Sequence, residues 1–204
     1  MLKPQNYDTT QAAGEFEPIK LGGHKMVIKQ VSEGKTKDTE LNKLIILFDF
    51  ADGDEQAGYF MKQFENDIRP DKKYPNAATN HMTVDESTDY GVRNLKTFIT
   101  CVEKSNPGFT VKWGDNFGQQ FKGKLIGGVF GVEKDWYDNR EINRHKLARF
   151  RSIEGINDAD IPKERTTKAY DDHLKEEAIM GANPAGTDFM NIPDSVADDV
   201  LPFN

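Results

Sequence analysis

The alternation of apolar and polar residues predicts five β-strands in this chain. It is clearest at 41–50, where one face of a strand collects Leu44, Ile46, Phe48 and Phe50. The content of β-branched and aromatic residues predicts the other strands at 24–31, 58–64, 122–133 and 143–153. Asp52-Gly53 is typical of a tight turn between the second and third strands.

One amphipathic helix is predicted between the third and fourth strands, over 90–105. Its apolar face collects Val92, Leu95, Phe98, Ile99 and Val102, and Asn106-Pro107-Gly108 ends it. Three of the glycines inside the fourth strand indicate a bulge or a sharp bend: Gly127, Gly128 and Gly131. The last strand loses its period of two between Leu147 and Phe150, where we expect a bulge.

This order of elements predicts a mainly β fold. Five strands with one helix between the third and the fourth are the order of an OB-fold, a partly open five-stranded barrel. An unrelated α+β sandwich is the alternative. We expect a flexible leader at 1–15, an OB-fold-like domain at 16–156, and a linker with an acidic C-terminal tail at 157–204. A short helix is expected within that last part, at 171–180.

The acidic residues gather near the C-terminus. The chain has 204 residues and a formal net charge of −7, and residues 166–204 hold two bases against eight acids. The remainder is therefore close to neutral and can still present a basic surface to a polyanion. A single cysteine, Cys101, indicates a reducing, cytoplasmic compartment, and no apolar run is long enough to predict a membrane-spanning helix.

The densest basic stretch lies in the hairpin of the last two strands. Arginines and lysines can neutralise phosphates there, while the aromatics just before them stack on bases. The nucleic-acid-binding candidates of this hairpin are Trp136, Tyr137, Arg140, Arg144, Lys146, Arg149 and Arg151. Tyr59 and Lys62, on the expected third strand, are weaker candidates. The alternative is a solvated strand face whose bases pair with the chain's many acids.

The sequence carries no catalytic motif. Its four histidines are scattered and form no His-Glu-x-x-His pair, and no Gly-x-Ser-x-Gly is present. We therefore predict no catalytic residue, no metal and no cofactor. A nuclease assembled from carboxylates that are far apart in the sequence remains an alternative.

The last residues combine acids with one large aromatic after a proline. The segment that we expect to bind a partner consists of Asp198, Asp199, Leu201, Pro202 and Phe203. It resembles the acidic Pro-Phe tail of bacterial single-stranded-DNA-binding proteins. In that family the Phe is the final residue and its carboxylate takes part in docking, whereas here Asn204 follows. An ordinary acidic tail is the alternative.

Several segments together resemble a family encoded by phages and prophages of low-GC Gram-positive bacteria. The resemblance rests on FIT at 98–100 with EKSNPG at 103–108, KGKLIGGVFG at 122–131, RFRSI at 149–153 and FMNIPD at 189–194. That family is associated with single-stranded-DNA binding. The resemblance implies an accessory protein of phage replication or recombination in the cytoplasm of the host bacterium, and it assigns no individual DNA contact.

These expectations describe a non-enzymatic binder of single-stranded DNA whose tail recruits replication or recombination proteins. The alternative is a phage adaptor or inhibitor with an OB-like body that does not bind nucleic acid. A homo-oligomer, a preference for RNA over DNA, the face that binds and the effect of Asn204 on docking are left open by the sequence.

Overall fold

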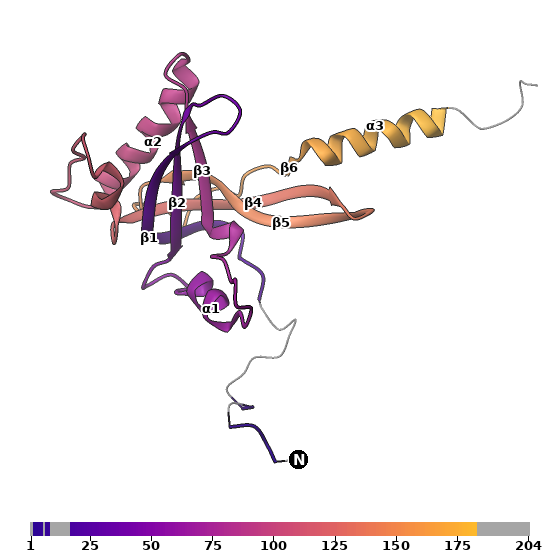
Figure 1. Cartoon of the computed structure of the whole chain (residues 1–204), viewed down its shortest axis with the longest axis horizontal. Helices are drawn as coiled ribbons and strands as arrows, with labels where there is room; N and C mark the ends of the chain where they lie inside the picture. The colour runs from indigo at the N-terminus through magenta and orange to yellow at the C-terminus, as the bar shows by residue number, and fades with distance from the viewer. Residues whose placement is uncertain (1, 6, 9–16, 183–204) are drawn as a thin grey trace, which may run out of the picture.

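The computed structural model describes residues 2–5, 7–8 and 17–182, and it consists of a curved sheet, two helices against it and a long hairpin arm (Figure 1). The strands are β1 (Gly22–Lys35), β2 (Asn42–Phe50), β3 (Thr79–Val84), β4 (Leu125–Tyr137), β5 (Arg140–Arg151) and β6 (Arg165–Thr166). The helices are α1 (Tyr59–Asn66), α2 (Asp89–Ser105) and α3 (Lys168–Ala182), with short 3-10 turns η1 (Asn76–Ala78) and η2 (Phe117–Phe121). Within this described part, no helix has the length and apolar character needed to cross a bilayer.

The sheet runs in the order β3-β2-β1-β4-β5, and all neighbours along this path are antiparallel. The short β6 pairs in parallel with β4, where Glu133 faces Arg165. Among the described residues, the edge strands β3 and β5 share no backbone ladder, so the sheet is open. A mainly β, antiparallel sheet is thus confirmed, whereas closure into a barrel is not.

The core lies on the concave side of the sheet. The period of two that predicts β2 buries Ile46 and Phe48 completely, and they meet Met26 and Ile28 of β1 in the same cluster. Phe98 and Val102, both on the predicted face of α2, are also fully buried in this cluster. Thr88 caps that helix, because its hydroxyl accepts a hydrogen bond from the backbone N–H of Gly91 at 3.2 Å.

The strand predicted at 58–64 is wrong: these residues form α1. Phe60 and Phe64 lie four residues apart, a spacing that fits a helix face as well as a strand face. Asp49 favours the helix over the strand. Its buried carboxylate accepts hydrogen bonds from the backbone N–H groups of Phe60 at 3.0 Å and Met61 at 3.3 Å, at the start of the helix. Tyr59 and Lys62 therefore lie on α1 and not on a strand.

The third strand is instead Thr79–Val84, in a segment whose polar composition hides it. Only Met82 and Val84 of this strand are buried. β3 takes the place of the misassigned segment, and α2 follows it before β4 and β5 as predicted, but α1 is a helix between β2 and β3 that the predicted order lacks.

The bulge predicted in the last strand is confirmed. Phe130 faces Leu147, but Val129 faces Arg149, so Ala148 has no partner in β4. One extra residue reverses the alternation of sides. Leu147 and Phe150 consequently both contact the core, while Arg149 and the preceding bases of β5 share the outer face.

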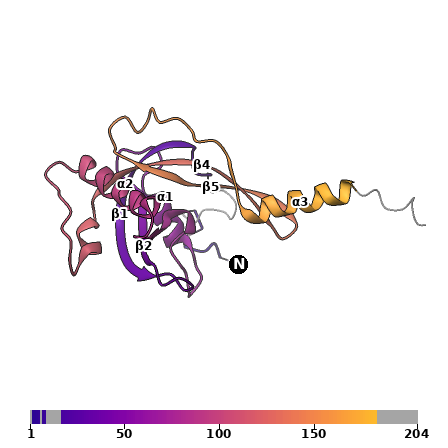
Figure 2. The ribbon, with the colours of Figure 1, turned by 90° about the horizontal axis from the view of Figure 1, so that it is seen from above.

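Residues 152–164 cross the outer face of β4 before the chain reaches β6 on the other edge of that strand. Contact is close, because a Cβ added at Gly131 would lie 2.6 Å from Cγ of Pro162. The helix expected near 171–180 is α3, and it lies beside the arm formed by the ends of β4 and β5 (Figures 1 and 2). Residues 183–204, with the predicted partner-binding tail, fall outside the described residues.

Candidate nucleic-acid interface

Three of the predicted hairpin bases pair with carboxylates on the outer face of the arm. The Arg140 guanidinium lies 3.5 Å from Asp138, that of Arg144 lies 2.9 Å from Asp135, and the Lys146 ammonium contacts Glu133. A hydrogen bond from Thr167 and the charge of Arg144 hold the pKa of Asp135 below its usual value. This part of the arm is therefore close to neutral, although exposed pairs contribute only about 0–1 kcal/mol each.

Arg149 and Arg151 differ from those three bases. Both are exposed, and among the described residues neither has a carboxylate within ion-pair distance. The Arg149 guanidinium lies 3.4 Å from the backbone carbonyl oxygen of Asp160. Their charge is therefore free to attract an anion.

The two aromatics at the end of the arm are placed differently. The Tyr137 side chain is 63% exposed. The Trp136 ring is covered by the His173 ring of α3, with centroids 3.5 Å apart and planes 10° from parallel. Of the two predicted stacking residues, only Tyr137 is open in this arrangement.

Tyr59 and Lys62 lie on α1, away from the hairpin. The Tyr59 hydroxyl donates to the carbonyl oxygen of Glu17 at 2.7 Å, and its ring is tilted against Phe50. Burial raises the pKa of Tyr59 above its usual value. The Tyr59 hydroxyl is hydrogen-bonded and its ring packs on Phe50, so the side chain is half-buried. Lys62 is exposed.

A groove with a volume of about 490 Å³ opens between the unpaired edges of β3 and β5, and we call it the seam groove. Its polar lining comes from Asn80, His81 and Thr83 of β3, Asp85 and Thr88 before α2, Asn94 and Thr97 of α2, Arg149 of β5 and Arg165 of β6, so it holds one carboxylate beside two guanidinium groups. Tyr90, at the start of α2, lines it as well and is 71% exposed. Guanidinium groups, amides and an open aromatic ring together suit a ligand that carries both phosphates and flat rings.

The bulge brings the second guanidinium to this groove. Arg165 reaches across β4 and donates a hydrogen bond to the carbonyl oxygen of Ala148 at 3.2 Å. Ala148 is the residue that the register shift leaves unpaired. The local backbone of β5 thus holds Arg165 beside Arg149.

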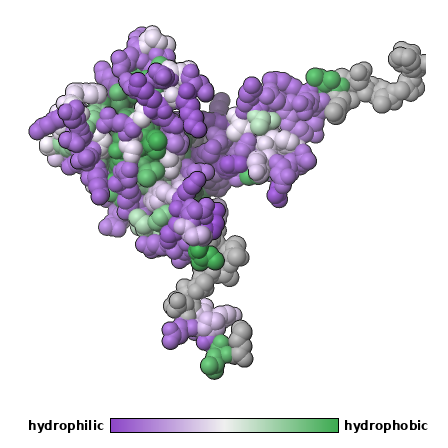
Figure 3. Space-filling view, in the orientation of Figure 1, coloured by the Kyte–Doolittle hydropathy of each residue, from purple (hydrophilic) through white to green (hydrophobic). Residues whose placement is uncertain are grey.

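The outer face of the sheet continues from the seam groove over β3, β2 and β1. Ile45 faces both His81 and Ser32, and Lys43 faces both Thr83 and Gly34. Farther along β1 a second hollow of about 530 Å³ is lined by Lys25, Val27, Lys29, Met61 and Leu125 among others. Figure 3 shows hydrophobic surface in this part of the molecule, bordered by hydrophilic side chains.

His81 lies where the seam groove meets the outer face of β2 and β3, because it lines the groove and faces Ile45. Burial and the neighbouring charge of Lys43 lower the pKa of His81. A neutral imidazole at pH 7 supplies a flat ring and a hydrogen bond in place of a further positive charge.

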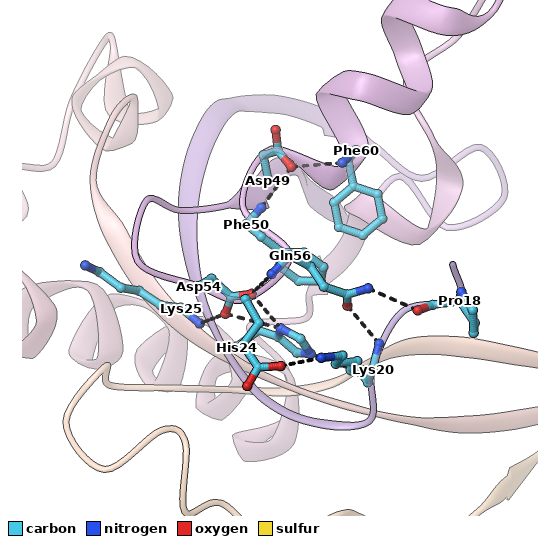
Figure 4. A network of polar contacts seen from close by, with 10 residues as sticks. Pro18, Lys20, His24, Lys25, Asp49, Phe50, Asp54, Gln56 and Phe60 are labelled. Atoms are coloured by element: carbon cyan, nitrogen blue, oxygen red, sulfur yellow. Dashed lines mark hydrogen bonds and ion pairs between the residues drawn. The ribbon is translucent and has the colours of Figure 1, made fainter. Parts of the chain in front are cut away.

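The most conspicuous buried polar cluster lies elsewhere, where the chain entering β1 meets the loop after β2 (Figure 4). His24 faces Asp54 through Nδ1 at 3.1 Å and the carbonyl oxygen of Lys20 through Nε2 at 2.9 Å. Burial alone would raise the pKa of Asp54, but hydrogen bonds from His24 and from the backbone N–H groups of Gln56 and Lys25 bring it below its usual value. Because both ring nitrogens are engaged, this cluster fastens two loops and leaves no nitrogen for catalysis.

Within residues 17–182, no group of three or more histidine, cysteine, aspartate or glutamate side chains is arranged to hold a metal ion. Comparison of the sequence with protein-family models and with curated proteins gave no match.

Proposed function

We propose that the protein is a non-enzymatic, sequence-tolerant binder of single-stranded DNA. The observation that carries the proposal is the seam groove, where two guanidinium groups without carboxylate partners in the described part of the chain, Arg149 and Arg165, share a hollow with the exposed ring of Tyr90. Arginines at phosphates and rings at bases are the two contacts that such binding uses.

The arrangement of the sheet supports an OB-fold-like body. The order β3-β2-β1-β4-β5, with α2 between the third and fourth strands, is the strand order of that fold. An OB-fold is a partly open barrel. In this chain the seam groove lies between β3 and β5, the two strands that would meet if the sheet closed. OB-folds bind oligonucleotides on the outer face of the second and third strands, which here is the face that carries Lys43 and His81.

In this proposal the strand enters at Arg149 and Arg165 and runs over the outer face towards Lys43, Lys29 and Lys25. The cations neutralise phosphates, while Tyr90, His81, Ile45 and Val27 contact the bases. Contacts with the faces of bases and with phosphates carry little sequence information, so binding tolerates any sequence. The hairpin bases Arg144 and Lys146 contribute less, because each would first have to leave a carboxylate.

The biological setting extends the proposal. The resemblance to the phage family supports a role beside replication or recombination enzymes in the cytoplasm of a bacterial host. The acidic segment with Leu201, Pro202 and Phe203 would recruit those enzymes, since an acidic end with an aromatic anchor suits a basic pocket.

Fluorescence anisotropy of a labelled oligo-dT strand, titrated with the full chain over a salt series, tests the proposal. A double logarithmic plot of affinity against salt should fall with a slope of about −0.7 for each phosphate neutralised. A duplex of the same length should bind more weakly, because its bases are not exposed. An unchanged anisotropy at low salt would overturn the proposal.

A second candidate function is that of an adaptor or inhibitor that does not meet nucleic acid. The neutral outer face of the arm and the covered ring of Trp136 favour it, because both remove contacts that a DNA site would use. It predicts no oligonucleotide binding at any salt concentration, together with capture of a protein partner that depends on Phe203.

A further inference from the structure

The stacking of His173 on Trp136 has the geometry of a base on an aromatic ring. Their ring centroids are 3.5 Å apart and the planes differ by 10°. A nucleobase stacked on tryptophan would occupy that same position, since flat rings in contact are separated by about 3.5 Å. The imidazole therefore fills the place on this ring where a base could sit.

Lys134, a cation on the same side of β4 as Trp136, is also paired with a residue of the C-terminal segment. Lys134 lies two residues before Trp136, so both side chains leave the strand on one side. The Lys134 ammonium is 3.0 Å from the carboxylate of Glu164, which raises the pKa of this lysine. His173 and Glu164 thus contact Trp136 and Lys134 in the way that a base and its phosphate would.

Helix α3 is held to the arm by few and mostly polar contacts. The Tyr170 hydroxyl donates to Glu141 at 3.1 Å, and the Thr167 hydroxyl donates to Asp135 at 2.7 Å. Among its described side chains none belongs to the buried core, and Leu174 and Ile179 are 45% and 67% exposed. Because little apolar surface is buried, the helix can leave the arm without disturbing the sheet.

Helix α3 carries four acids, Asp171, Asp172, Glu176 and Glu177, against Lys168 and Lys175, of which Lys175 pairs with Asp172, so its net charge is negative. The helix therefore repels a polyanion that approaches the arm while it is docked, and it loses its own contacts when that polyanion takes its place.

We propose that Trp136 and Lys134 form a subsite for one nucleotide of a single strand, base on ring and phosphate on ammonium, which Glu164 and His173 cover in the absence of ligand. The subsite rests on the proposed function and extends it from the seam groove to the arm. Binding and uncovering are coupled. The apparent affinity of the subsite therefore equals its intrinsic affinity multiplied by the fraction of molecules in which α3 has left the arm.

The test uses the full chain with Trp113→Phe, which leaves Trp136 as the only tryptophan. His173→Ala with Tyr170→Phe removes the stacked ring and one anchoring hydrogen bond, and Leu174→Ala, an exposed neighbour, is the matched control. Without ligand, acrylamide should quench Trp136 more in the double variant than in the control. With oligo-dT, the double variant should bind up to roughly tenfold more tightly, the gain expected when a covered stacking site is opened. Adding Trp136→Ala should abolish that gain.

The outcomes separate this inference from the proposed function. If oligo-dT binds the parent chain, but the double variant matches the Leu174→Ala control in affinity and in quenching, the covered subsite is wrong and the seam groove stands. If no variant binds oligo-dT at low salt, both proposals fall.

Discussion

The guanidinium of Arg165 lies 3.2 Å from the carbonyl oxygen of Ala148, the residue of β5 that has no partner in β4. This contact joins the bulge to the seam groove. The extra residue keeps Arg149 on the outer face together with Arg144 and Lys146, and it exposes the carbonyl that holds Arg165 in place. A feature visible as a broken period in the sequence therefore assembles the groove's two guanidinium groups.

Reversing the charge of these two arginines should weaken oligo-dT binding more than reversing the charge of paired hairpin bases. We expect Arg149→Glu with Arg165→Glu to lower the affinity at least about tenfold, since each lost phosphate contact becomes a repulsion. Arg144→Glu with Lys146→Glu carries the same charge change on residues that already have carboxylate partners. Anisotropy titrations at one low salt concentration compare the two. Equal losses would indicate a general effect of charge and would contradict the seam groove as the main site, and a larger loss in the hairpin variant would place that site on the arm.

Neutral replacement of the same arginines should change the salt dependence of binding. With Arg149→Gln and Arg165→Gln, two phosphate contacts are lost and the double logarithmic slope should become shallower by about 1.4. Arg69→Gln, in a loop outside the groove lining and paired with Asp67, is the matched control and should leave the slope unchanged. An unchanged slope in the groove variant would mean that these arginines do not meet phosphates.

The close packing of residues 152–164 on the sheet should make Gly23 intolerant of a side chain. A Cβ at Gly23 would lie 1.6 Å from the backbone carbonyl oxygen of Ile156, whereas a Cβ at Gly34 of the same strand would meet nothing within 4 Å. We expect Gly23→Ala to lower the free energy of unfolding by about 1–3 kcal/mol, as overpacking does. Gly34→Ala should change it little. Urea denaturation measures both, and equal midpoints would show that this segment does not pack on β1.

The carboxylate of Asp54 should make stability depend on pH in the acid range. Its pKa in the folded chain lies below the ordinary value of 3.8, so its contribution is fully present above pH 3.8 and is lost as the pH falls through the folded pKa. The difference in unfolding free energy between the wild-type chain and Asp54→Asn should therefore shrink from about pH 5 towards pH 2. Denaturant midpoints across this range test it. A difference that grows between pH 5 and pH 2 would contradict the arrangement around His24.

The sequence predicts this fold best where one period is unambiguous. The apolar face of α2 and the strand β2 follow directly from spacing, and the position of the bulge follows from the conflict between Leu147 and Phe150. At 58–64 the spacing of Phe60 and Phe64 fits either a helix or a strand. The choice is made by Asp49, a residue of the preceding strand that no local pattern connects to them.

The candidate site was predictable only in part, because its members come from different elements. Arg149 belongs to the basic stretch that the sequence shows plainly. His81 sits in a polar strand without a recognisable period, and Arg165 lies beyond the domain boundary expected at 156. The pairing of Arg144 and Lys146 with acids of β4 depends on the register of the hairpin, which composition does not give. The tail residues lie outside the described part of the chain, so their role stays a prediction.

Ultraviolet cross-linking of oligo-dT to the full wild-type chain, followed by peptide mapping, tests the central claim most directly. The account predicts that the highest yield of cross-linked peptides comes from β3 and the start of α2, where His81 and Tyr90 line the seam groove. Cross-links that fall outside this groove, the outer face of β1 and β2 and the Trp136 subsite of the arm, or none at low salt, would contradict it.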